Sequence, residues 1–116
     1  MQGLRDLRIV DFSDRIAGAY TTKLMADAYA EVIKVEPADG EKLRSWTSSG
    51  QDLQGKDGAL FQFLNTSKKS VVGSMDDEHV DALLKGADLL VETSGGEMNA
   101  AALCERYPGL VVLSIS

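Results

Sequence analysis

The sequence predicts a three-layer α/β domain built around a mainly parallel β-sheet. Short apolar segments recur along the chain without alternating with polar residues, a pattern typical of strands that are covered on both faces. Segments with helical spacing of apolar residues lie between them. The stretch from Arg8 to Pro37 has the order strand, turn, helix and strand, which is one βαβ unit of the Rossmann-like kind.

This first unit sets the pattern for the rest of the chain. Its predicted elements are a strand at Arg8–Phe12, a helix at Asp14–Ala28 and a strand at Glu31–Val35. Ser13 is a candidate N-cap of the helix, because its hydroxyl can accept a hydrogen bond from a free amide of the first turn. Four apolar residues recur at helical spacing, and we expect them to form one buried stripe: Ile16, Tyr20, Leu24 and Ala28.

The segment from Glu36 to about Asp57 is long, polar and rich in glycine, and a loop of this length in a small domain is usually functional or disordered. Trp46 gives it a side chain to pack, so we expect an ordered excursion. The further predicted elements are short helices near Glu41–Trp46 and at Gly58–Leu64, a strand at Ser70–Gly73, a helix at Asp76–Lys85, a strand at Asp88–Glu92, a helix at Glu97–Arg106 and a strand at Leu110–Ile115.

Composition limits the classes of function. The chain has 116 residues, which suits one domain, and a net charge of −6, which argues against general nucleic-acid binding. We see neither an apolar run long enough for a membrane span nor a signal peptide, and therefore expect a cytoplasmic protein. Cys104 is the only cysteine, so we predict no internal disulfide and a small core residue. Because the last predicted strand ends where a site-forming loop is expected, we anticipate the front part of a longer protein.

Standard cofactor motifs are missing from the sequence. It has neither a G-x-G-x-x-G nor a G-x-x-x-x-G-K-[ST] segment, and one histidine with one cysteine cannot build a typical zinc site. The carboxylates are scattered, and no pair stands out as an acid/base couple. We therefore assign no catalytic residue and no metal ligand.

Basic residues in or beside loops are the first candidate binding groups: Lys42, Arg44, Lys68 and Lys69. Charge-assisted hydrogen bonds from such groups suit a phosphate-rich ligand, although solvated surface residues are the alternative. Thr93, Ser94 and the pair Gly95-Gly96 precede a predicted helix, an arrangement that favours anions. A simple helix-entry turn is the alternative there.

A series of segments resembles the family III CoA-transferases of the CaiB/BaiF type, a group that includes acyl-CoA racemases such as α-methylacyl-CoA racemase. The resemblance covers nearly the whole chain, in order. The matching segments are Gly3-Leu4, Leu7–Ser13, Ala17–Ala19, Met25–Pro37, Asp39–Arg44, Asn65–Val71, Ala87–Thr93 and Tyr107–Ser116.

The resemblance implies an α/β domain that binds coenzyme A within a chain several times longer, and an interlocked dimer. Transferases of the family use an aspartate nucleophile and racemases an acid/base pair, both downstream of this segment. By position, Arg44, Asn65, Lys68 and Lys69 match segments that line the CoA site. Thr93 and Ser94 stand where the family usually has asparagine and an aromatic residue, and are also carried over as CoA-binding candidates.

We accordingly interpret residues 1–116 as the N-terminal portion of the family's large Rossmann-like domain, incomplete relative to the family. The expected role is binding of a CoA thioester within an acyl-CoA:carboxylate CoA-transferase. The alternatives are a racemase fragment and a non-catalytic CoA-binding or dimerisation module. Expected partners are an acyl-CoA and a second copy or a larger family member, with neither nucleic acid nor membrane.

Overall fold

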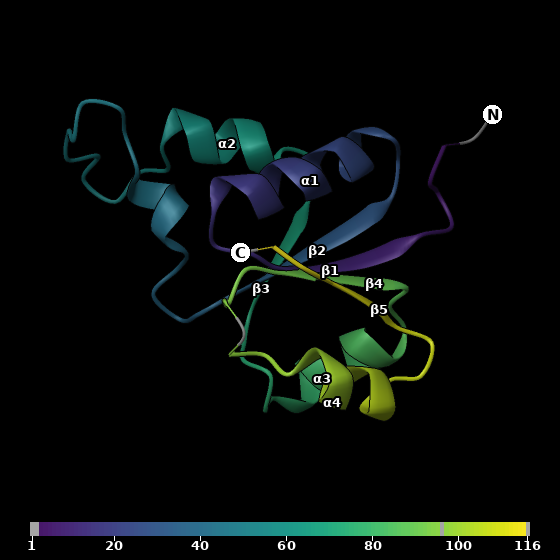
Figure 1. The fold of residues 1–116 in the computed structure, drawn as a ribbon. Helices are drawn as coiled ribbons and strands as arrows, with labels where there is room; N and C mark the ends of the chain where they lie inside the picture. The colour runs from purple at the N-terminus through teal and green to yellow at the C-terminus, as the bar shows by residue number, and fades with distance from the viewer. Residues whose placement is uncertain (1–2, 96, 116) are drawn as a thin grey trace.

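In a computed structural model, residues 3–95 and 97–115 are described, and they form an α/β domain (Figure 1). The elements in chain order are β1 (Arg8–Phe12), α1 (Ile16–Asp27), β2 (Glu31–Glu36), a 3-10 helix η1 (Lys42–Ser45), α2 (Ala59–Asn65), β3 (Lys69–Val72), α3 (Glu78–Lys85), β4 (Leu89–Glu92), α4 (Ala100–Arg106) and β5 (Val111–Ser114). Within the described part of the chain, no helix has the length and apolar character needed to cross a membrane.

The strands form one sheet in the order β3-β2-β1-β4-β5, and every pairing is parallel. Helices α1 and α2 cover one face of the sheet, and α3 and α4 cover the other (Figure 1). From β1 the chain winds outward to β2 and β3, then crosses back to β4 and β5. The direction therefore reverses between β1 and β4, and such a reversal point is where ligands bind in open α/β sheets. The predicted three-layer α/β class is confirmed.

Alternate residues along the strands face two different cores. Val10, Val35 and Leu90 pack with side chains of α3 and α4, such as Leu84 and Leu103. Strand residues that point to the other face of the sheet pack on the side of α1. Their cluster contains Ile9, Ala26, Ala30, Val32 and Val91. A third cluster joins α1 to η1 and α2 and contains Ala19, Leu43, Phe61 and Leu64. The sheet is thus held on both faces, as the continuous apolar strands predict.

The predicted buried stripe of α1 is wrong. Ile16, Tyr20 and Leu24 are 49%, 48% and 52% exposed, and Ala28 follows the helix as its C-cap. The buried residues of the helix are Gly18, Ala19, Thr22 and Ala26. Small residues face the sheet because the helix lies so close to it: a Cβ atom at Gly18 would come within 2.4 Å of the Ser13 Cβ atom. The segment is helical as predicted, but the face that packs on the sheet is the one with small side chains.

Three smaller expectations also need correction. Ser13 does not cap α1, since Arg15 occupies the N-cap position and the Ser13 hydroxyl donates to Asp11 Oδ1 at 2.5 Å. Cys104 is exposed rather than part of the core. Strand β5 is covered on one face only, because Val111 and Leu113 lie exposed.

Candidate functional site

A crevice of about 500 Å³ opens at the point where the sheet reverses direction. Its walls come from the segments that follow β1, β2, β3 and β4, at the carboxyl edge of the sheet. The residues that line it are Phe12, Ser13, Asp14, Val35, Pro37, Asp39, Gly40, Glu41, Lys42, Gly73, Ser74, Met75, Thr93, Ser94, Glu97 and Met98. Parallel strands bring these segments together because all their carboxyl ends meet at one edge.

Thr93 joins the two strands on either side of the reversal. Its hydroxyl oxygen accepts a hydrogen bond from the Asp14 backbone amide at 3.1 Å, and the hydroxyl donates to Asp14 Oδ1 at 3.0 Å. The segment after β1 is thereby tied to the end of β4. In this wall of the crevice Thr93 is buried, whereas Asp14 is exposed.

Ser94 is ordered by the buried Glu92 side chain. Glu92 Oε2 accepts hydrogen bonds from the Ser94 amide at 2.8 Å and from its hydroxyl at 2.6 Å. Burial opposes ionisation of Glu92, but the Ser94 hydrogen bonds outweigh it and keep the pKa of this carboxyl below its usual value. The Ser94 hydroxyl oxygen also accepts from the Met98 amide at 3.0 Å. This turn is therefore preorganised beside the crevice.

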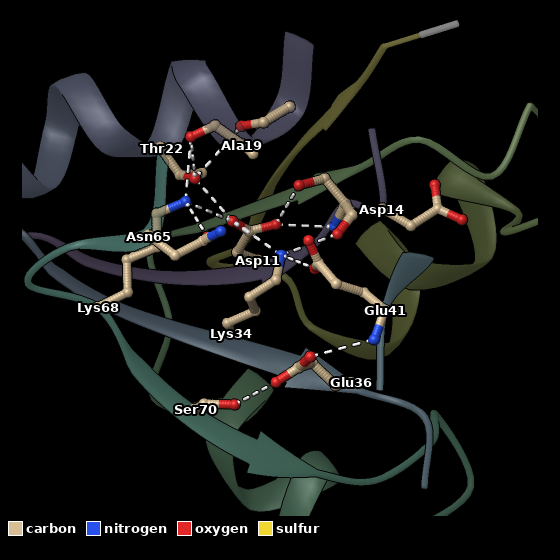
Figure 2. A network of polar contacts seen from close by, with 12 residues as sticks. Asp11, Asp14, Ala19, Thr22, Lys34, Glu36, Glu41, Asn65, Lys68 and Ser70 are labelled. Carbon is tan, nitrogen blue, oxygen red and sulfur yellow. Dashed lines mark hydrogen bonds and ion pairs between the residues drawn. The ribbon is translucent and has the colours of Figure 1, made fainter. Parts of the chain in front are cut away.

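The other four predicted site residues line a separate pocket of about 170 Å³ against α2. Its walls include Arg44, Asn65, Lys68 and Lys69. Lys68 is the most enclosed, with a side chain that is 1% exposed. Its Nζ atom donates to Asn65 Oδ1 at 2.8 Å, to the Ala19 carbonyl at 3.0 Å and to Asp11 Oδ2 at 3.3 Å (Figure 2). These three acceptors match the three protons of an ammonium group.

Burial and pairing act in opposite directions on Lys68. Burial lowers the pKa of this lysine, and Asp11 counteracts the shift through its charge and its hydrogen bond. The ammonium has its ion partner inside the protein. In the described arrangement it stabilises the fold rather than facing solvent.

Arg44 is also paired within the chain. Its Nε atom donates to Glu36 Oε1 at 2.6 Å, and its second terminal nitrogen donates to Glu36 Oε2 at 2.7 Å. The remaining nitrogen donates to both oxygens of Asp57 at 2.9 Å. The Arg44 hydrogen bond lowers the pKa of Glu36 to about 2 against the effect of burial. Carboxylates therefore occupy two edges of the guanidinium group.

Lys69 and Lys42 keep their side chains in solvent. The Lys69 side chain is 72% exposed, and its Nζ atom lies 3.8 Å from Glu31 Oε2. Lys42 is exposed and lines the crevice. The structure thus divides the predicted basic residues into a paired set, Arg44 and Lys68, and an accessible set, Lys42 and Lys69.

Sequence reasoning missed a buried polar network under the crevice (Figure 2). Asp11 is fully buried and accepts hydrogen bonds from the Ser13 amide at 2.7 Å and from the Thr22 hydroxyl at 2.6 Å. Lys34 is buried, donates to the Ser13 carbonyl at 2.9 Å and forms an ion pair with Glu41. The available signal was a charged residue inside each of the first two apolar strands, because a buried charge needs partners.

The chain was compared with known proteins. The model of CoA-transferase family III matches residues 4–116. Succinyl-CoA:mesaconate CoA-transferase of Haloarcula hispanica is 35% identical over 99% of this chain and 32% of its own length. Formyl-CoA:oxalate CoA-transferase of Rhodopseudomonas palustris is 35% identical over 81% of this chain and 22% of its own length.

A solved structure has the same arrangement. A CaiB/BaiF family protein from Brucella suis superposes with a TM-score of 0.81 at 27% identity, covering 97% of this chain and 33% of that protein. The chain therefore spans about a third of the length of the first of these curated relatives and of this structural neighbour. With a family match from residue 4 to residue 116 and a shared fold, the chain belongs to CoA-transferase family III.

Proposed function

We propose that residues 1–116 form the N-terminal part of the large domain of a family III CoA-transferase and help to bind its CoA thioester substrate. The observation that carries this proposal is the crevice of about 500 Å³ at the reversal point of the sheet. That position is the usual ligand site of open α/β sheets. The relatives named above are CoA-transferases, which supports a CoA thioester as the ligand.

The reaction we propose is acyl-CoA:carboxylate CoA transfer, with the catalytic aspartate outside this chain. Thr93 and Ser94 would bound the ligand within the crevice. Lys42 would meet its phosphate groups, because its ammonium group is exposed at the crevice and is a compact point charge. Lys69 is also accessible but lines the separate pocket, and would act on the ligand only through its charge at longer range. The role we propose for Arg44, Asn65 and Lys68 is structural. Their hydrogen bonds would hold η1, α2 and β3 in place without contact to the ligand.

Calorimetric titration of the 116-residue chain with coenzyme A tests this proposal. We expect saturable binding that weakens with added salt, because salt screens the attraction between the ligand phosphates and exposed lysines. The double variant Lys68→Ala with Lys69→Ala should bind more weakly and depend less on salt. The single variants Lys42→Ala and Lys69→Ala separate ligand contact from folding, because neither lysine is buried.

Lys56→Ala is the matched control, since it removes one exposed lysine that lines neither pocket. Equal losses in Lys56→Ala, Lys42→Ala and Lys69→Ala would indicate a general charge effect. The absence of heat and of saturation at millimolar coenzyme A would overturn the CoA assignment for this chain.

An assembly role is a second candidate, because exposed apolar side chains lie on α1 and on β5. They are Ile16, Tyr20, Leu24, Val111 and Leu113. Exposed apolar surface of this kind favours association with another chain. Sedimentation of the wild type and of Leu24→Lys tests this role: we expect association in the wild type and less of it in the variant. A monomeric wild type at all concentrations would count against it.

A further inference from the structure

We propose that the outer edge of β5 pairs with β5 of a second copy of this chain, in antiparallel orientation and in one register. The inference rests on the assembly role proposed above, which it deepens by naming the surface, the partner and the register of the contact. It is independent of the ligand that the crevice binds.

The sheet has two edge strands, β3 and β5, and the edge of β3 is protected. The Gly73 amide donates to the Glu36 carbonyl at 2.9 Å, so β3 turns its Val72 carbonyl away from β2. His79 Nε2 lies 2.7 Å from that carbonyl oxygen and must donate to it, because a carbonyl oxygen only accepts. The exposed Lys69 adds a charge to the same strand. An occupied carbonyl and a lysine both oppose pairing with another chain.

The edge of β5 has neither form of protection. Its sequence, Val-Val-Leu-Ser, contains no charged residue. The Ile115 amide donates to the Glu92 carbonyl at 3.0 Å, and alternate residues of a parallel strand face the same neighbour. The amide and carbonyl groups of Val112 and Ser114 therefore point away from β4. Among the described residues, no strand pairs with this side of β5.

Apolar side chains accompany these free backbone groups. Val111 and Leu113 are 63% and 38% exposed. They point to the same face of the sheet as Ile115, which packs on the side of α1. A strand that pairs with the edge of β5 would therefore satisfy backbone groups and cover apolar surface in one contact.

One antiparallel register of two β5 strands matches both features. With Leu113 opposite the partner's Leu113, Val112 lies opposite the partner's Ser114, and Val111 lies opposite the partner's Ile115. Val112 and Ser114 then form hydrogen-bonded pairs, in which each residue exchanges its amide and its carbonyl with the residue opposite. The other three residues bring apolar side chains together on the exposed face, and no like charges meet.

A shift of the register leaves backbone groups unmatched. Moving it by one pair toward the start of the strand places Ser114 opposite the partner's Leu110. The Leu110 amide already donates to the Tyr107 carbonyl at 2.9 Å within its own chain, so Ser114 would lose a donor. In the proposed register both copies use the same edge, and the contact closes after two copies instead of growing into a fibre.

Sedimentation equilibrium of charge variants at Leu113 tests the register. Leu113→Lys should weaken self-association by about tenfold or more, because two ammonium groups face one another where two leucine side chains met. Leu113→Glu should do the same. An equimolar mixture of the two variants should associate to within about threefold of the wild type, because opposite charges then meet. Val72→Lys, on the protected edge, is the control and should leave association unchanged.

A backbone variant tests the edge itself. Val112→Pro removes an outward amide and no hydrogen bond to β4, so it should weaken self-association by about tenfold or more. It should bind coenzyme A as the wild type does, because Val112 lines neither pocket. Since each copy has a net charge of −6, added salt should strengthen self-association, whereas it should weaken coenzyme A binding.

Three results would overturn the inference. Unchanged association in Leu113→Lys and Val112→Pro would exclude the β5 edge; if Leu24→Lys removes association instead, the contact lies on α1 and the assembly role stands. A mixture of Leu113→Lys and Leu113→Glu that stays monomeric would exclude the register. A wild type that is monomeric at all concentrations would overturn this inference and the assembly role together, while the coenzyme A titration would still decide the proposed ligand.

Discussion

The pocket against α2 and the crevice at the sheet edge contain similar residue types in opposite states. In the pocket, Lys68 and Arg44 are matched to internal acceptors. In the crevice wall, Glu41 is buried and paired with Lys34, and Lys42 is exposed. The basic residues of the pocket are thus neutralised within the protein, whereas the basic residue of the crevice is accessible to a ligand.

This difference shows that a charged residue in the sequence is available to a ligand only if the fold leaves it without a buried partner. Removing one member of a buried ion pair leaves the other charge buried without a partner, which lowers the free energy of unfolding by about 3–5 kcal/mol. An exposed ion pair contributes only about 0–1 kcal/mol to that free energy. Stability measurements should therefore respond to the pocket, and ligand affinity to the crevice.

The largest effect is expected from Lys68→Met, which leaves the buried Asp11 without one of its cationic neighbours. We expect a loss of about 3–5 kcal/mol in the free energy of unfolding, measured by urea denaturation. Lys69→Met is the adjacent control and should change stability by less than about 0.5 kcal/mol, because its side chain lies in solvent. Similar losses of stability in the two variants would contradict the division into a paired Lys68 and an accessible Lys69.

Glu36 should make the stability of the pocket depend on acid pH. Arg44 lowers the pKa of this carboxyl to about 2, so the folded state favours its ionised form. The resulting stabilisation is complete above the ordinary pKa of about 4.5 and is lost as the pH falls from there toward 2. It amounts to on the order of 2 kcal/mol after allowance for the partial exposure of Arg44.

The measurement is chemical denaturation of the wild type and Glu36→Gln across this pH range. The variant should be less stable at neutral pH, and the difference should shrink as the pH approaches 2. A difference that stays constant with pH would show that the Glu36 charge does not contribute.

Thr93→Val tests the contact across the reversal point. The variant loses the hydrogen bonds between the Thr93 hydroxyl and Asp14. We expect a loss of about 1 kcal/mol in stability and a several-fold weaker affinity for coenzyme A, measured by calorimetry. Thr21→Val is the control, because its hydroxyl donates only within α1, to the Ala17 carbonyl. Unaltered affinity in Thr93→Val would remove Thr93 from the site.

The smallest effect is expected on the outer face of α1. Leu24→Ala should change the free energy of unfolding by less than about 0.5 kcal/mol, since Leu24 lies outside the core. Ala19→Leu, on the buried face, should cost about 1–3 kcal/mol through overpacking. A loss of more than about 2 kcal/mol in thermal or urea denaturation of Leu24→Ala would restore the predicted orientation of the helix.

Chain order and local chemistry made much of the fold predictable. Continuous apolar segments such as Arg8–Phe12 predicted buried parallel strands, and all five strands were predicted at their observed places to within about two residues. Thr93 and Ser94 were predictable as edge residues because they directly follow a strand, and parallel strands share one carboxyl edge.

The tertiary structure alone decided which side chains are paired and which are accessible. Lys68 and Lys69 are neighbours in the sequence, yet one is enclosed beside Asp11 and the other lies in solvent. Asp11, Lys34 and Glu41 come together only when β1, β2 and the segment before η1 pack against one another. The same packing turned the small face of α1 toward the sheet. Such outcomes depend on partners distant in the sequence, and local propensity contains no information about them.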